Sequence, residues 1–180
     1  MKKPTAVPVV RAALLTALLS VVGGGVHAAS DTATATAVVL TPMTITKNTN
    51  LVFGNVVQGN GTVTVQTDGT RTLASNTAPA VSGVTATAGK FTVGGTAAQG
   101  YAITYTPPAT LASGGNTMAF SLLAEAVDAA TPTGAAVGTA ATFTPAGATS
   151  YIYIGGTLTV GATQAAGTYT GNVVVSVDYN

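Results

Sequence analysis

Few residues of this 180-residue chain have the types and spacing that catalysis requires. Nucleophilic catalysis needs a general base, but the chain has no cysteine and one histidine, His27, close to the N-terminus. Glu125 and Asp128 are the only carboxylates close together in the sequence, and glycoside hydrolysis requires two that converge across a cleft. The commoner interpretation of such a pair is a solvated loop edge. We therefore expect no enzyme activity.

Sites for metals, phosphates and nucleic acids are not indicated either. Zinc sites use cysteine and histidine, and the five carboxylates are too scattered to favour calcium. The glycine pairs at 94–95 and 155–156 precede no Lys-Ser or Lys-Thr, so turns or strand ends are expected there. Beyond residue 28 the only basic residues are Lys47, Arg71 and Lys90, which form no basic patch. We expect no cofactor and no nucleic-acid partner.

The N-terminus predicts export. Met1-Lys2-Lys3 is followed by an apolar run over residues 12–22 and then by Val26-His27-Ala28, which are the three parts of a secretory signal peptide. The apolar run is shorter than the ~20 residues that span a bilayer, so a retained membrane anchor is not favoured. Residues 1–28 are the expected signal, with cleavage after Ala28. The remaining protein would pass through the periplasm to the cell surface, a fimbrium or the medium.

The mature chain, residues 29–180, has three basic and five acidic residues, a net charge of −2. Charged residues make up 6% of the chain, whereas soluble domains average about 25%. Polar surface must therefore come largely from threonine, serine and asparagine, and threonine suits the solvent face of a strand. Without cysteine no disulfide can form, but this length is sufficient for one domain with its own core.

Residues 167–180 carry the clearest strand pattern. In an extended chain one face presents the residues Tyr169, Gly171, Val173, Val175, Val177 and Tyr179, whereas the other face is mostly polar. This alternation predicts a half-buried β-strand. The last strand of a closed sandwich would explain the pattern by itself.

Shorter runs of the same period precede it, separated by Gly, Pro and the Asp68-Gly69 turn signal. They predict an all-β, immunoglobulin-like antiparallel sandwich. Residues 129–148 lack a clear period and are expected to be mostly loop. The side chains expected in the core are Phe53, Phe91, Tyr101, Ile103, Phe120 and Val175. The expected strands are residues 43–46, 51–54, 62–67, 70–73, 84–88, 90–93, 101–105, 116–126, 151–154 and 158–160.

An N-terminal arm, residues 29–40, precedes these strands. It alternates threonine and alanine and then becomes aliphatic, and an extended chain places Ala33, Ala35, Ala37 and Val39 on one face. Pro42 interrupts the ladder because it has no N–H to donate. The pattern predicts a bent first strand at the edge of the sandwich.

Four sequence blocks carry a family resemblance: Leu51-Val-Phe-Gly54, Gly61-Thr-Val-Thr-Val65, Leu158-Thr-Val-Gly161 and Gly167-Thr-Tyr-Thr-Gly171. In these the mature chain resembles the domain-of-unknown-function family 4402 of exported Gram-negative proteins. That family is similar in pattern to spore-coat-U-like pilins of the chaperone-usher type. The C-terminal motif of pilus subunits has a glycine fourteenth from the end, alternating apolar residues and a penultimate tyrosine. Gly167, Val173, Val175, Val177 and Tyr179 occupy these places.

The resemblance implies a non-catalytic fimbrial or surface-fibre subunit with a role in cell adhesion, whose sandwich lacks its last strand. A periplasmic chaperone, an outer-membrane usher and neighbouring subunits would then be its partners. The five C-terminal residues named above would border the groove, and the arm residues Ala33, Ala35, Ala37 and Val39 would fill it. Alanine buries less apolar area than the larger anchors expected of a donor strand.

A different function follows if the fold closes itself. The protein would then be a secreted β-sandwich that binds a surface ligand or a glycan as a monomer. The two hypotheses differ in whether a strand from outside completes the domain.

Overall fold

The computed structural model describes residues 28–74, 84–134 and 140–180. The expected signal peptide, except for Ala28, lies outside these residues. Two compact units divide at residue 37, and the arm up to Ala37 is described separately from the domain that begins at Val38. Every regular element in the described residues is a strand, as predicted, and the strands form an antiparallel β-sandwich of immunoglobulin-like type.

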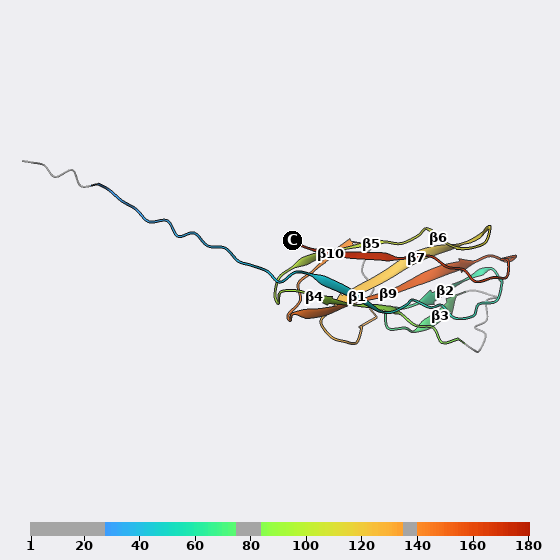
Figure 1. Ribbon diagram of the computed structural model, residues 1–180. Coiled ribbons are helices and arrows are strands. Elements are labelled where there is room, and N and C mark those ends of the chain that lie inside the picture. Colours follow the sequence, from blue (N-terminus) through green and yellow to red (C-terminus); the bar gives the residue numbers. More distant parts are fainter. Residues whose placement is uncertain (1–27, 75–83, 135–139) are drawn as a thin grey trace, which may run out of the picture. The chain divides into compact units, whose positions relative to one another are not determined.

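Two sheets make up the sandwich (Figure 1). The smaller sheet has the order β10-β5-β8, and the larger contains the other seven strands. The strands of the larger sheet are β1 (Thr44–Thr49), β2 (Gly61–Val65), β3 (Arg71–Ala74), β4 (Gly89–Gly94), β6 (Thr110–Ser113), β7 (Asn116–Val127) and β9 (Thr149–Val160). Those of the smaller sheet are β5 (Tyr101–Thr106), β8 (Ala140–Phe143) and β10 (Val174–Tyr179).

The long strand β9 organises the larger sheet. One of its edges pairs with β7, and the other pairs first with β4 and then with β2. The prediction of two strands interrupted at residues 155–156 was wrong, since β9 is continuous. A Cβ atom on Gly155 would meet the carbonyl oxygen of Val65, and one on Gly156 would meet the ring of Phe120. The two glycines thus allow neighbouring strands to approach closely and do not form a turn.

The core consists of two clusters of buried side chains. The first core cluster lies on one face of β2, β7 and β9 in the larger sheet, and the second lies between β5 and the β4–β9 part of that sheet. Burial is confirmed for Phe53, Tyr101, Ile103 and Phe120, whereas Phe91 and Val175 are only half-buried. The first cluster comprises Phe53, Val63, Val65, Leu111, Met118, Phe120, Leu158 and Val160, and the second comprises Val93, Tyr101, Ile103, Tyr105, Ala124, Ile152 and Ile154.

Other strand predictions differ from the structure in their bounds. Residues 29–40 form no strand, and Val39 is 94% exposed; alanine and threonine offer too little apolar area to hold a strand on a core. Residues 51–54 contribute a single bridge, Val52 to Thr87, and residues 167–173 a single bridge, Thr170 to Ala112. The sequence pattern also missed β6, which pairs with β7 through a turn at Gly114.

Candidate functional site: an open groove beside the C-terminal strand

The C-terminal strand β10 is hydrogen-bonded along one edge. It pairs with β5, which places Val175 opposite Tyr105 and Val177 opposite Ile103. No described strand pairs with its other edge. At the end of the larger sheet, β1 likewise pairs with β4 alone. Edges of this kind present unpaired backbone N–H and C=O groups to a further strand.

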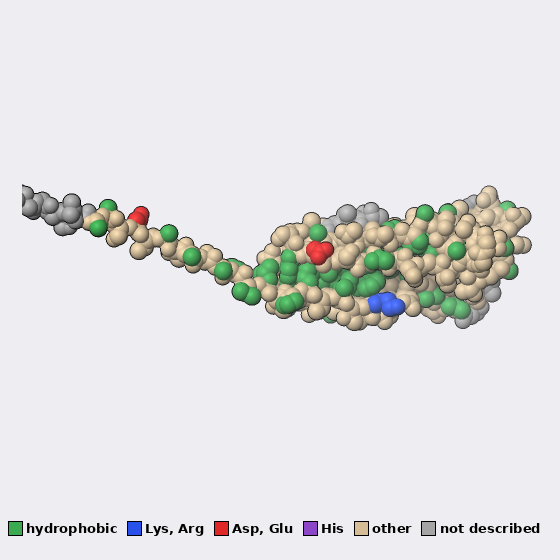
Figure 2. All heavy atoms as spheres, turned by 45° about the horizontal axis from the view of Figure 1, so that its top comes forward, with side chains coloured by type: hydrophobic (Ala, Val, Ile, Leu, Met, Phe, Trp, Pro, Cys, Tyr) green, Lys and Arg blue, Asp and Glu red, His purple; other side chains and the backbone are tan. Residues whose placement is uncertain are grey.

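The inner face of β10 is apolar and half-buried. Its side chains alternate as predicted, with Val175, Val177 and Tyr179 packed against the second core cluster and Val174 on the outer face 56% exposed. Val173, just before the strand, contacts both clusters, and Phe91 and Met43 are likewise partly buried against the second. Figure 2 shows a stripe of hydrophobic side chains along one face of the domain. Core residues are therefore left partly uncovered.

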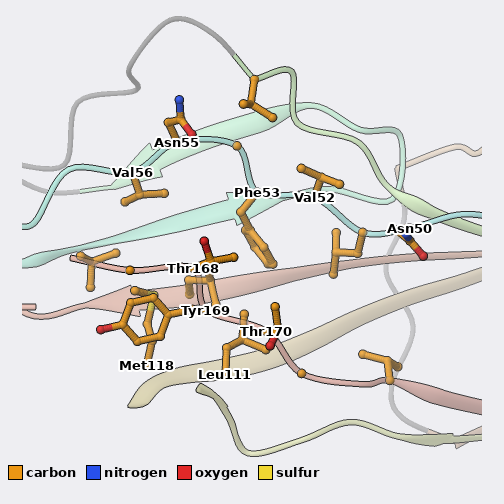
Figure 3. Close-up of a pocket in the computed structure, with 18 of the residues that line it drawn as sticks. Asn50, Val52, Phe53, Asn55, Val56, Leu111, Met118, Thr168, Tyr169 and Thr170 are labelled. Carbon is orange, nitrogen blue, oxygen red and sulfur yellow. The ribbon is translucent and has the colours of Figure 1, made fainter. Parts of the chain in front are cut away.

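A cavity of about 1370 Å³ opens between two chain segments. One is residues 47–58, which begin within β1, and the other is residues 164–174, which end at the first residue of β10. Phe53, Leu111 and Met118 point into the space between them, next to the ring of Tyr169 (Figure 3). Leu158 and Val160 of β9 complete an apolar floor that belongs to the first core cluster. The cavity is larger than the ~300–1,000 Å³ of most small-molecule pockets.

This cavity is confined to one end of the groove. Its lining includes Val173 and Val174 but no residue further along β10. We call the cavity lined by Phe53, Leu111, Met118, Tyr169 and Val173 the wide end, and the unpaired strand edge at residues 175–179 the narrow end.

Tyr179 forms a junction at the narrow end. Its hydroxyl accepts a hydrogen bond from the backbone N–H of Thr96 and donates one to the carbonyl of Thr41, both at 2.7 Å. The N–H of Thr41 donates in turn to the hydroxyl of Thr96 at 2.8 Å. We call this set of hydrogen bonds the Tyr179 junction. It holds Thr41, where the N-terminal arm joins the domain, beside the end of β10.

Gly167 lies at the wide end. A Cβ atom at this position would meet the Ser113 side chain of β6, so a glycine allows the chain to pass close to that strand. The adjacent Tyr169 is fixed by polar contacts: the Gln164 amide donates to its hydroxyl at 2.6 Å, and this hydroxyl donates to the carbonyl of Ala165 at 2.8 Å. The Gln164 amide also donates to the carbonyl of Thr117 in β7. These contacts position the wall of the wide end.

The arm residues predicted to act as a donor are described as exposed chain. Ala33, Ala35 and Ala37 have exposed side chains and belong to no strand, and Val39 is also exposed. Of the five C-terminal residues, Val173, Val175, Val177 and Tyr179 share the inner face, while Gly167 lies apart at β6. No sequence pattern predicted Leu111, Met118 and Tyr169 as lining residues, although Tyr169 lies in one of the four sequence blocks.

Glu125 is buried, so the interpretation of a solvated loop edge was wrong for this residue. Its side chain is 3% exposed and accepts hydrogen bonds from the Thr67 hydroxyl, the Thr133 hydroxyl and the N–H groups of Thr133 and Gly134. Burial by itself raises the pKa of this carboxyl, but the hydrogen bonds from Thr133, Thr67 and Gly134 outweigh it and leave the pKa below its usual value. Asp128 is exposed. Glu125 therefore fixes a loop to the sandwich and does not face a cleft with Asp128.

Two further observations concern metal ligands and apolar helices in the described residues. They contain no group of three or more His, Cys, Asp or Glu side chains arranged to hold a metal ion. They also include no apolar helix of membrane-spanning length.

Comparison with known proteins agrees with the four sequence blocks. The search of curated proteins found no match. The family model described as domain of unknown function (DUF4402) matches residues 43–179, which include every described strand and both walls of the groove. The chain therefore belongs to the DUF4402 family.

Proposed function

We propose that the mature protein is a non-catalytic, exported structural subunit that assembles into a surface fibre by β-strand complementation. One observation carries the proposal: β10 has an unpaired edge, and the segment that leads into it lines an open cavity whose floor is the first core cluster. A strand added there would gain backbone hydrogen bonds along β10 and would bury apolar side chains in the groove.

The N-terminal arm of a second copy is the occupant that fits. It has twelve residues, which in extended form reach about 40 Å at ~3.3 Å per residue, so it exceeds the six residues of β10. Its alternating face, Ala33, Ala35, Ala37 and Val39, would enter the groove, while the threonines at positions 32, 34 and 36 on the other face would remain in water.

The proposed partners follow from the same mechanism. A subunit with an open groove needs protection before assembly, so a periplasmic chaperone would lend a strand and an outer-membrane usher would mediate the exchange. This corresponds to the spore-coat-U-like and chaperone-usher pilus subunits that the sequence resembles. The signal peptide over residues 1–28 supplies the route to the periplasm and then to the surface, where a fibre would serve adhesion.

Fusion of the arm to the C-terminus tests the proposal. Residues 30–40 are appended after Asn180 through a flexible linker, and the mature chain without the fusion is compared with it. We expect the unmodified chain to form multimers and the fusion to be a monomer with a higher denaturation midpoint. The matched control carries Asp at positions 33, 35, 37 and 39 of the appended segment, because a charge cannot be buried unpaired in the groove.

Deletion of residues 29–40 provides the complementary measurement. The shortened chain should no longer form multimers but should bind a synthetic peptide of residues 29–40. A monodisperse, cooperatively unfolding monomer without any added strand would contradict the proposal and would favour a self-complete secreted binding module in its place.

A further inference from the structure

A second cavity lies beside Lys90 and Tyr153, on the face of the larger sheet opposite the second core cluster. Val93 and Ile152 belong to that cluster, so alternation along β4 and β9 places Lys90 and Tyr153 on the other face. The cavity has a volume of about 380 Å³, at the lower end of the ~300–1,000 Å³ range of small-molecule pockets. It shares one lining residue, Thr49, with the cavity of the groove.

Buried polar side chains hold one wall of this cavity in place. Thr67 lines the cavity and is fully buried, and its hydroxyl donates to the Glu125 carboxylate at 2.7 Å. The same carboxylate accepts from the N–H of Thr133 at 2.8 Å, and the Tyr153 hydroxyl donates to the carbonyl of Ala130. The loop that follows β7 is therefore fixed to the sandwich, and its inner side forms a wall that exists before any ligand binds.

Lys90 supplies the hydrogen-bond donors of the cavity. Its ammonium group lies 4.6 Å from the ring centroid of Tyr151 and 5.3 Å from that of Tyr153, and these cation–π contacts restrict the side chain. The ammonium also donates one long hydrogen bond, 3.4 Å, to the carbonyl of Ala130. An ammonium has three N–H donors, so donors remain for a ligand in the cavity.

Asp68 and two threonines supply the acceptors. Asp68 accepts from the N–H of Thr70 with one carboxylate oxygen at 2.8 Å, which leaves its second oxygen for a ligand. The hydroxyls of Thr49 and Thr87 donate to backbone carbonyls at 3.0 and 3.1 Å, so their oxygens keep lone pairs that can accept.

From this set of groups we infer that the cavity is a carbohydrate-binding site for one neutral sugar unit of a surface glycan. Lys90 repels a cation, whereas Asp68 and the nearby Glu125 repel an anion, so a neutral ligand is favoured. Sugar hydroxyls both donate and accept, and can therefore bond to Asp68 and Lys90 together. The C–H groups of a sugar ring suit the apolar lining residues Ala86, Ala88 and Pro132.

This inference does not rest on strand complementation, because the cavity lies apart from β10. It adds a contact through which an exported protein, assembled or monomeric, would attach to a glycan-coated surface.

A glycan array tests the inference. The labelled mature chain is applied to immobilised glycans that end in galactose, mannose, N-acetylglucosamine, glucuronic acid or sialic acid. We expect binding to at least one of the three neutral sugars, competed by the same sugar in free form, and weaker binding to the two acidic ones. Free glycine serves as a second competitor, because a zwitterion could use Lys90 and Asp68 without being a sugar.

Three variants locate the binding in this cavity. Lys90→Met keeps an unbranched stem beside the tyrosine rings but removes the ammonium, and Asp68→Asn keeps an oxygen for the N–H of Thr70 but removes the charge. Each should weaken glycan binding about tenfold or more, because each removes hydrogen bonds to a charged group. Ala88→Leu changes no charge, and its larger side chain should exclude the sugar from the cavity.

The matched control is Lys47→Met, which removes an exposed lysine of β1 that does not line this cavity and should leave binding unchanged. Circular dichroism of every variant shows whether the sheet is intact, and Ala88→Leu provides the test if a charge variant fails to fold. The absence of binding to every glycan, equal binding by all the variants, a preference for the acidic sugars, or competition by glycine alone would each overturn the inference. None of these results bears on whether the chain forms multimers.

Discussion

The side chains of β5 and β10 illustrate how a residue's surroundings decide its contribution to stability. Ile103 and Val177 are opposed in the register of the smaller sheet, yet Ile103 is 1% exposed and Val177 is half-buried. β5 has a strand on each side, β10 and β8, whereas β10 has only β5. Truncation of a β5 side chain therefore leaves a cavity inside the protein, whereas truncation on β10 enlarges a groove that is already open.

The first prediction compares two aliphatic residues of this sheet. Ile103→Ala should lower the free energy of unfolding by about 2–5 kcal/mol, because it removes a fully buried side chain. Val174→Ala, at an exposed position of β10, should change it by less than about 0.5 kcal/mol. Urea denaturation of both variants measures the difference. Equal midpoints for the two would show that Ile103 is not a core residue.

The second prediction concerns the buried carboxylate of Glu125. Glu125→Gln should destabilise the fold by about 1–3 kcal/mol at neutral pH, because an amide cannot accept all the hydrogen bonds from Thr67, Thr133 and Gly134. The pKa of Glu125 is lower in the folded than in the unfolded chain, where it is about 4.3. The ionised Glu125 therefore gives its full stabilisation at a pH above the unfolded-state pKa, and this stabilisation is lost as the pH falls through the folded-state pKa.

Denaturation midpoints of the wild type and of Glu125→Gln at pH 7 and in acid test the effect. The advantage of the wild type should shrink as the pH is lowered. A difference that stayed constant with pH would mean that ionisation of Glu125 contributes nothing to stability.

At the scale of elements, β9 depends on residues that have almost no side chain. Gly156 lies against the Phe120 ring. A Cβ atom placed on Gly156 would lie 2.8 Å from the carbonyl oxygen of Ser121. Gly156→Ala should therefore force β7 and β9 apart and destabilise the sandwich by about 1–3 kcal/mol. The matched control is Gly115→Ala in the β6–β7 turn, where an added Cβ meets nothing within 4 Å. Thermal denaturation of the two variants gives the comparison, and equal losses would argue against close packing at Gly156.

The sequence predicted β7 correctly, because Met118, Phe120 and Leu122 alternate over a long run. It did not predict the continuity of β9. A pair of glycines in the sequence is compatible both with the end of a strand and with a continuous strand that a neighbouring strand approaches closely. Phe120 and Val65, which decide between the two, are distant in the sequence. β6 was missed because only one of its four side chains, Leu111, is buried. A single apolar residue cannot show the alternation by which a strand is recognised.

The groove could be predicted in part. Alternation placed Val173, Val175, Val177 and Tyr179 on one face, and the structure places their side chains together against the core. Burial of Val175 was overestimated because periodicity specifies a face but not what covers it. Leu111 and Met118 reach the cavity through the pairing of β6 with β7, which no local pattern encodes.

At the scale of the whole molecule, the scarcity of charge predicts how assembly responds to salt. Residues 29–180 have eight charged side chains, and the proposed interface relies on apolar burial and backbone pairing. Raising NaCl from about 0.1 M to about 1 M shortens the Debye length from ~10 to ~3 Å, and the association constant should change by less than about threefold. Sedimentation of the mature chain in the two buffers measures this. A tenfold weakening at high salt would show that ion pairs hold the copies together.

The position of β9 in the chain has a consequence for when the protein can fold. The strand that joins β2, β4 and β7 is the ninth of the ten strands in the described residues, so the earlier hairpins have no common sheet until residue 160 is available. Isolated hairpins are marginally stable, and pairings between distant segments form slowly. We therefore expect a chain that ends at residue 148 to lack the circular-dichroism signal of a folded sheet.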